Sequence, residues 1–124
     1  MEDRSQNVMR AVRLVQEKLA QGFTVIVAMI SPFKKDRAHA RSQFIPFQFK
    51  EVYVSTPLSV CENRDPKGLY KKTRKGLILD MTGIHSPYEP PSNPDIIIDT
   101  SNQSIESSIE IIMQALCMKG LNPL

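Results

Sequence analysis

The sequence predicts an α/β domain built around a parallel sheet, and three observations support this prediction. Apolar residues recur at helical spacing near both ends of the chain, continuous apolar runs lie between them, and the two kinds of segment alternate. The length of 124 residues suits one domain, and 41% hydrophobic with 23% charged residues is typical of a globular chain.

The first expected element is an amphipathic helix from Arg4 to Gln21, which Gly22 ends. Its apolar positions recur every three or four residues, at Val8, Ala11, Val12, Val15 and Leu19. The segment from Phe23 to Ile30 is almost continuously apolar and rich in β-branched residues, which predicts a strand buried on both faces. A short helix is expected from Lys34 to Ser42.

The second half of the chain is expected to hold two further strands, from Phe49 to Val54 and from Asp95 to Ile98. Between them, Leu58 to Asn63 predicts one or two helical turns, and the proline-rich segment from Asp80 to Pro94 predicts a loop. Ser104 is a suitable N-cap for a final helix. That helix carries apolar residues on one face, at Ile105, Ile109, Ile112, Met113 and Leu116.

Positive charge is concentrated between Arg64 and Lys75, a stretch that holds six of the sixteen basic residues with Asp65 as its only acid. Pro66 and Gly68 interrupt the stretch, so one continuous helical face is not expected. A basic loop after a strand suits a lid that closes over phosphate groups. A solvated surface loop is equally consistent with the composition. The net charge of +3 does not by itself indicate nucleic acid, and a single interleaved tyrosine disfavours it further.

Parallel sheets bind ligands beyond the carboxyl ends of their strands, so the candidate site lies after the expected strands, at residues 31–33, 55–57 and 99–102. Ser31 could present its hydroxyl group to a ligand, or it could simply be the polar end of a strand. Arg4 and Asn7 lie one turn apart at the start of a helix, where they could hold an anion. Without further information, ordinary N-terminal polar residues are the favoured explanation of that pair.

Several classes of protein are disfavoured. Cys61 and Cys117 show neither zinc-site nor disulfide-framework spacing, and His39 and His85 show no metal or triad spacing, so no metal site is expected. No apolar run reaches membrane-spanning length, and the start of the chain has no signal-peptide pattern. These observations predict a cytoplasmic protein without a membrane partner.

Four segments carry longer motifs. They read Glu-Asp-Arg-x-x-Asn-x-x-Arg from residue 2, Ile-Ser-Pro-Phe from residue 30, Phe-Lys-Glu-Val-Tyr-Val-Ser-Thr-Pro-Leu from residue 49 and Arg-Asp-Pro-Lys-Gly-Leu-Tyr-Lys-Lys from residue 64. In this order the segments resemble the adenylylsulfate kinase family, whose members transfer a phosphoryl group from ATP to the 3′-hydroxyl of adenosine 5′-phosphosulfate in sulfate assimilation. The resemblance implies a P-loop-kinase-like three-layer α/β sandwich with a parallel sheet.

The resemblance also implies roles for individual residues. Ser31, the catalytic candidate, would occupy a position described as a phosphoserine in some members. The residues that bind adenylylsulfate would be Arg4, Asn7, Ile30, Ser31, Lys67, Asp80 and Met81. Those that bind the nucleotide would be Arg64, Gln103 and Ser108. The co-substrate would be ATP with Mg, and residues 64–80, called the lid below, would close over the ligands.

Two departures from the family pattern bear on activity. Met81 stands where the family has a phenylalanine that stacks on the substrate adenine, so a sulfur contact replaces aromatic stacking. No segment reads Gly-x-x-x-x-Gly-Lys-[Ser/Thr]. The resemblance therefore implies that the N-terminal strand, the P-loop and most ligands for ATP and Mg are missing.

From these departures we expect residues 1–124 to form a single partial adenylylsulfate kinase domain that is inactive alone. A non-catalytic module that binds adenylylsulfate or regulates through it is the alternative. An exposed apolar strand edge would also favour a homodimer or another form of self-association. No nucleic-acid partner is expected.

Overall fold

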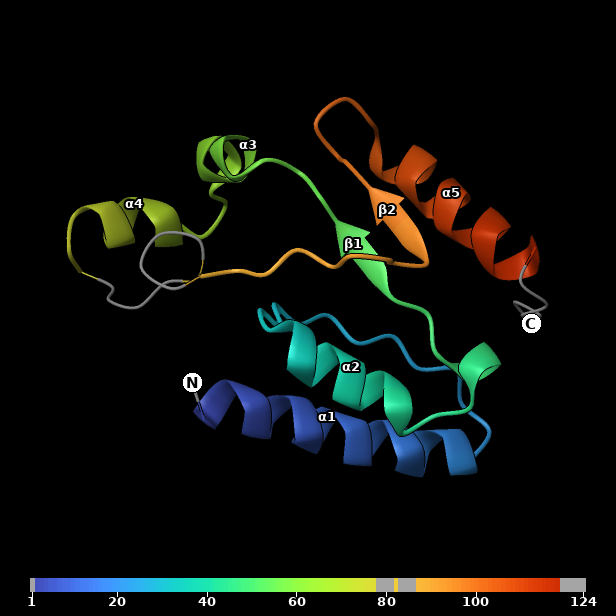
Figure 1. The fold of residues 1–124 in the computed structure, drawn as a ribbon. Coiled ribbons are helices and arrows are strands. Elements are labelled where there is room, and N and C mark those ends of the chain that lie inside the picture. Colours follow the sequence, from blue (N-terminus) through green and yellow to red (C-terminus); the bar gives the residue numbers. More distant parts are fainter. Residues whose placement is uncertain (1, 78–81, 83–86, 119–124) are drawn as a thin grey trace. The chain divides into compact units, whose positions relative to one another are not determined.

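A computed structural model describes residues 2–77, 82 and 87–118 (Figure 1). The chain divides into two compact units, the first ending at Phe49 and the second beginning at Lys50. Each unit is described by itself below. Among the described residues, no helix is both long enough and apolar enough to cross a membrane.

The first unit is a pair of helices, α1 (Glu2–Ala20) and α2 (Lys34–Ser42), which lie side by side (Figure 1). Val8 and Val12 on the predicted apolar stripe of α1 are buried together with Ala40 of α2. Two half-buried rings, Phe44 and Phe49, pack against this core. Both helices match the sequence prediction, since apolar spacing is a local property that specifies which helix face is buried.

The end of α1 is fixed by the glycine that the sequence predicted. Gly22 has φ +89°, a left-handed conformation that glycine adopts without a steric penalty. Its N–H donates to the carbonyl of Leu19 at 2.9 Å, and the N–H of Phe23 donates to the carbonyl of Lys18 at 3.1 Å. These two bonds form a Schellman motif, and the Lys18 ammonium lies 5.7 Å from the centre of the Phe23 ring.

The prediction of a strand from Phe23 to Ile30 is wrong, because residues 23–33 have no regular secondary structure. Most of the segment is exposed, and Ile26 keeps 93% and Ile30 65% of their surface accessible. A strand buried on both faces needs hydrogen-bonded neighbours and two covering layers. Among the described residues the only strands are the two of the second unit, which pair with each other. A segment of strand-like composition therefore forms no strand.

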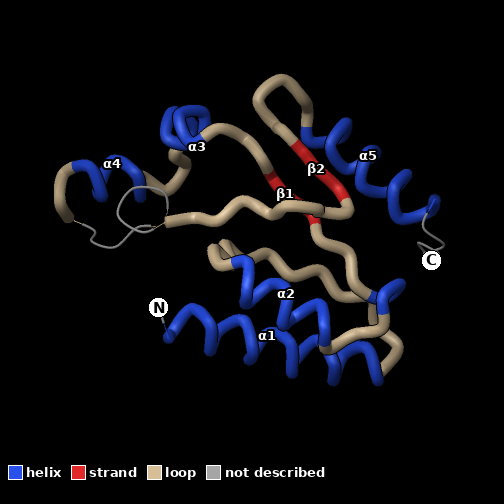
Figure 2. The backbone as a smooth tube through the Cα atoms, in the orientation of Figure 1, coloured by secondary structure: helices blue, strands red, loops and turns tan. Residues whose placement is uncertain are grey.

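The second unit contains a two-stranded parallel sheet of β1 (Val52–Val54) and β2 (Ile96–Ile98), drawn in red in Figure 2. Val52 pairs with Ile96 and Val54 with Ile98, so parallel pairing is confirmed, although both strands are shorter than predicted. Ile96 and Ile98 are buried, and α5 (Ile105–Met118) packs beside β2. Asp95 extends the pairing, because its side chain accepts the N–H of Glu51 at 2.7 Å.

The remaining elements are short. In the first unit, Pro46–Gln48 forms a single 3-10 turn. In the second unit, α3 (Leu58–Arg64) matches its prediction and is followed by α4 (Leu69–Arg74), which was not predicted. The helix-breaking residues act before α4 rather than within it, since Gly68 has φ +66° at the N-cap. In the loop expected at residues 80–94, the described residues 87–94 contain neither helix nor strand.

The start of α5 confirms the predicted cap. The side-chain oxygen of Ser104 accepts the backbone N–H of Ser107 at 3.0 Å. This bond satisfies one of the four N–H groups that a helix leaves without a partner at its first turn.

We predict that Ser104→Ala lowers the free energy of unfolding by about 1 kcal/mol, because the cap is lost. Urea denaturation followed by circular dichroism measures this change. Ser107→Ala is the matched control, since Ser107 contributes only its backbone N–H to the cap. Equal destabilisation by the two substitutions would contradict the prediction.

The exposed apolar segment at residues 23–30 predicts self-association of the isolated chain. We expect Ile26→Lys to reduce the associated fraction, because a charge would be buried in any contact made through this segment. Light scattering after size-exclusion chromatography measures the effect. Gln48→Lys adds the same charge at an exposed polar position and serves as the control. A monodisperse wild-type monomer that melts cooperatively would overturn the expectation.

Candidate functional site

Two of the expected anion-binding residues lie on the first turns of α1. Arg10 donates from Nη1 to the side-chain oxygen of Asn7 at 3.0 Å, and Asn7 is exposed. Arg4 is half-buried one turn before Asn7. The half-buried Ser5, next to Arg4 in the chain, donates from its hydroxyl group to the carboxylate of Asp36 in α2 at 2.8 Å. The positive end of the helix dipole lies at this end of α1, which favours an anion there.

Ser31 lies in the connection that leads into α2, and its backbone is unusual. Its φ is +43°, in the left-handed region that non-glycine residues rarely adopt. Arg37 of α2 donates from Nη1 to the Ser31 carbonyl at 2.5 Å, and Phe33 is buried just beyond it with 6% of its surface accessible. The neighbouring Ile30 is exposed. Ser31 therefore lies at a bend before α2, where Arg37 bonds to its carbonyl, rather than at the end of a strand.

The segments after β1 and β2 meet at the carboxyl edge of the sheet, as parallel pairing requires. The side-chain oxygens of Thr56 and Thr100 lie 2.7 Å apart, and the N–H of Thr100 donates to the Thr56 side-chain oxygen at 2.9 Å. Arg64, at the end of α3, donates from Nη1 to the Thr100 side-chain oxygen at 2.6 Å and from Nη2 to its carbonyl at 2.7 Å. One of the predicted nucleotide-binding residues is thus joined to the sheet edge.

The other two predicted nucleotide-binding residues lie together at the start of α5. The Ser108 hydroxyl donates to the side-chain oxygen of Gln103 at 3.4 Å. Ser108 is buried with 9% of its surface accessible, whereas Gln103 is exposed. The structure therefore brings this pair into contact from positions five residues apart.

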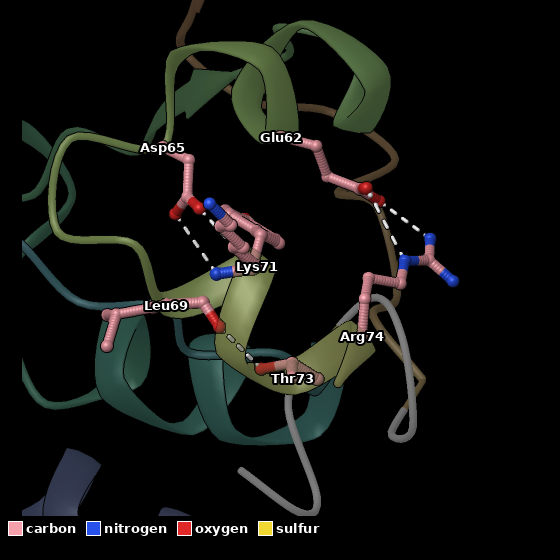
Figure 3. A network of polar contacts seen from close by, with 7 residues as sticks. Glu62, Asp65, Leu69, Lys71, Thr73 and Arg74 are labelled. Atoms are coloured by element: carbon pink, nitrogen blue, oxygen red, sulfur yellow. Dashed lines mark hydrogen bonds and ion pairs between the residues drawn. The ribbon is translucent and has the colours of Figure 1, made fainter. Parts of the chain in front are cut away.

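The lid begins with a tight turn held by Asp65 (Figure 3). Its two carboxylate oxygens accept the backbone N–H groups of Tyr70 and Lys71, each at 3.0 Å, and its carbonyl accepts the N–H of Gly68 at 3.0 Å. Asp65 has φ +24°. The turn leaves Lys67 exposed at its tip.

The lid helix α4 is tied to α3 by an ion pair. Arg74 lies 2.7 Å from a carboxylate oxygen of Glu62, and the hydrogen bond and the charge of that carboxylate raise the pKa of Arg74 (Figure 3). Thr73, next to Arg74 in α4, is buried, and its hydroxyl group donates to the Leu69 carbonyl at 2.7 Å. Burial, followed by the nearby Cys61 and acidic groups, raises the pKa of the Tyr70 phenol. The start of the lid therefore contains the helix α4, joined to α3 by this ion pair, which corrects the expectation of a loop.

The basic side chains of the lid are directed to solvent. All six basic residues from Arg64 to Lys75 are exposed, although the charge of Arg74 is already paired with that of Glu62. The expected site residues Asp80 and Met81 lie outside the described residues. No three histidine, cysteine, aspartate or glutamate side chains gather among the residues that the structure describes, so no ligand is assigned to Mg.

Comparison with solved structures defines the fold class first. The chain superimposes on the Mycobacterium tuberculosis APS kinase CysC, solved in complex with AMPPNP and APS, with a TM-score of 0.87 and 39% identity. The match covers 94% of this chain and 68% of that one. The fold is therefore the P-loop-kinase-like α/β fold that the sequence predicted.

Sequence comparison then identifies the family. A profile of the adenylylsulphate kinase family matches residues 1–99, and the chain belongs to this family. It is 50% identical over 119 residues to a probable adenylyl-sulfate kinase of Halalkalibacterium halodurans and 44% identical over 119 residues to one of Bacillus subtilis. Each alignment covers 96% of this chain but 57% and 60% of those relatives, so the chain spans little more than half of their length.

Sequence reasoning located the edge of the sheet but missed the residues that build it. Segments 55–57 and 99–102 were expected to carry chemistry, yet neither Thr56 nor Thr100 was singled out. The available signal was a threonine at the same distance beyond two strands that pair in parallel, since such residues meet at one edge. Asp65 was also missed, although aspartate before Pro and Gly commonly accepts backbone N–H groups in a turn.

We predict that Asp65→Ala destabilises α4 locally by about 1 kcal/mol, because two backbone N–H groups lose their acceptor. Amide hydrogen exchange at Tyr70 and Lys71 measures the change directly. Asn63→Ala, at an exposed position two residues earlier, is the control and leaves both exchange rates unchanged. Unchanged exchange in Asp65→Ala would show that the carboxylate does not hold the turn.

Proposed function

We propose that this chain forms part of an adenylylsulfate kinase domain, in which ATP phosphorylates the 3′-hydroxyl of adenosine 5′-phosphosulfate. In that reaction the hydroxyl oxygen bonds to the γ-phosphorus, the bond from that phosphorus to the β–γ bridging oxygen breaks, and the hydroxyl proton is lost. ADP and 3′-phosphoadenylylsulfate are the products. The structural match to an APS kinase solved with AMPPNP and APS is the observation that carries the proposal.

The first unit would supply contacts to adenylylsulfate. Arg4 and Asn7 occupy the positive end of α1, where a guanidinium and an amide suit a phosphosulfate group. Ser31 and Ile30 would line the same ligand, with the Ser31 backbone held by Arg37. The hydrogen bond from Arg37 supports this role, because a backbone held by a neighbouring side chain positions a ligand contact better than an unsupported loop does.

The second unit would supply the lid and the purine contacts. Lys67, exposed at the tip of the turn held by Asp65, would approach adenylylsulfate, as would Asp80 and Met81. Arg64, Gln103 and Ser108 would lie around the nucleotide. The exposed basic face of the lid supports a polyanionic ligand, because a positive surface attracts phosphate groups.

The 124 residues contain no glycine followed by lysine, and so no phosphate-binding loop of the Gly-x-x-x-x-Gly-Lys-[Ser/Thr] type. Phosphoryl transfer depends on positioning and charge stabilisation by such a loop and by Mg. We therefore infer that this polypeptide, assayed alone, binds ligands without turning over. A non-catalytic module that binds adenylylsulfate is the second candidate, favoured because the sequence holds more of the residues expected to bind adenylylsulfate than of those expected to bind ATP.

Calorimetry with adenylylsulfate and with ATP, combined with a coupled assay of ADP release, tests the proposal. We expect both ligands to bind, no ADP release that depends on adenylylsulfate, and an approximately tenfold higher Kd for adenylylsulfate in Lys67→Ala. Lys35→Ala, which removes an exposed charge from α2, is the control.

The outcomes separate the candidates. Binding of adenylylsulfate without ATP would favour the non-catalytic module over the kinase domain. Turnover by the 124-residue chain would refute its inactivity, and binding of neither ligand would refute the proposed function itself.

A further inference from the structure

Arg64 is the exposed member of a hydrogen-bonded set that includes two half-buried threonines, each just beyond the end of a strand. Thr56 follows β1 and Thr100 follows β2, and the two are bonded both through their side chains and through the Thr100 N–H. Thr100 in turn receives two hydrogen bonds from the Arg64 guanidinium. The arginine is therefore anchored to the sheet through a residue 36 positions away in the chain.

The two hydrogen bonds to Thr100 use the edge of the Arg64 guanidinium and not its flat faces. Both bonds come from the terminal nitrogens, Nη1 and Nη2, and hydrogen bonds from a guanidinium lie in its plane. The flat faces of the group are not used by these bonds, and the residue is exposed. A planar cation fixed in this way is suited to stack on an aromatic ring such as a purine.

We propose that Thr100 is a positioning residue for nucleotide binding, which holds the Arg64 guanidinium in the orientation that stacks on the purine of ATP. This inference rests on the proposed function, in which Arg64 lies near that purine. Thr100 itself does not need to touch the ligand. Its side-chain oxygen and its carbonyl restrict the rotation of a long side chain before the ligand arrives.

A free arginine side chain samples many rotamers, and fixing it on binding opposes association. The two hydrogen bonds that Arg64 donates to Thr100 already restrict the side chain in the unbound protein, so less conformational entropy is lost on binding. Thr56 contributes indirectly, because its side chain orients the Thr100 hydroxyl and accepts the Thr100 N–H. Removing the Thr100 hydroxyl should therefore weaken ATP binding while leaving adenylylsulfate binding unchanged.

Nuclear magnetic resonance titrations of the full chain with ATP and, separately, with adenylylsulfate test the proposal. We expect Thr100→Val to raise the Kd for ATP about tenfold. Thr100→Ser, which retains the hydroxyl, should stay within about threefold of the wild type. Thr24→Val makes the same chemical change at an exposed position in the first unit and should alter neither Kd.

A double substitution shows whether Thr100 acts through the arginine. In an Arg64→Ala background, Thr100→Val should have no further effect on the Kd for ATP, because the group that it positions is already absent. A further loss in that background would overturn the proposal. If Thr100→Val fails to fold, Thr56→Val is the second variant. It removes the hydroxyl group that is hydrogen-bonded to Thr100, and it should also raise the Kd for ATP.

Each remaining outcome has one meaning. An unchanged Kd for ATP in Thr100→Val, or an equal weakening of both ligands, would overturn the positioning role and leave the proposed function standing. Binding of adenylylsulfate without ATP by the wild type would also overturn it. If the wild type binds neither ligand, the proposed function fails and this inference fails with it.

Discussion

The parallel pairing of β1 with β2 is the constraint on which the second unit depends. It joins segments 44 residues apart in the chain, as the bond between Thr56 and Thr100 illustrates. Without this pairing the two threonines would not meet, Arg64 would have no anchor at the sheet edge, and α5 would have no buried isoleucines to cover. The chemistry of the carboxyl edge is thus a direct consequence of strand direction.

The helices could largely be predicted from the sequence because their signals are local. The apolar stripe of α1, the left-handed glycine at position 22 and the Ser104 cap each act within a few residues, and all three are present. The existence and the parallel direction of β1 and β2 were also predictable from their apolar runs. Their lengths were not, because a strand extends only as far as its partner supplies hydrogen bonds.

The differences between the predicted and the observed elements have equally specific causes. Residues 23–30 have the composition of a buried strand, but composition does not provide the neighbouring strand that such a segment requires. The helix α4 is not predictable from a glycine that ordinarily interrupts helices, because here the left-handed backbone of Gly68 precedes its first residue. The contact between Gln103 and Ser108 is local in sequence, whereas Thr100 has its partner Arg64 36 positions away and carries no local signal.

Two consecutive residues, Arg64 and Asp65, connect the start of the lid to two different elements. The side chain of one residue is bonded to the sheet and the side chain of the next to the first turn of α4, while Glu62 and Arg74 brace the two helices. These contacts restrict the torsions on both sides of one peptide bond before any ligand is present. If the lid contacts a ligand as proposed, less conformational entropy is lost on binding than for an unrestrained loop.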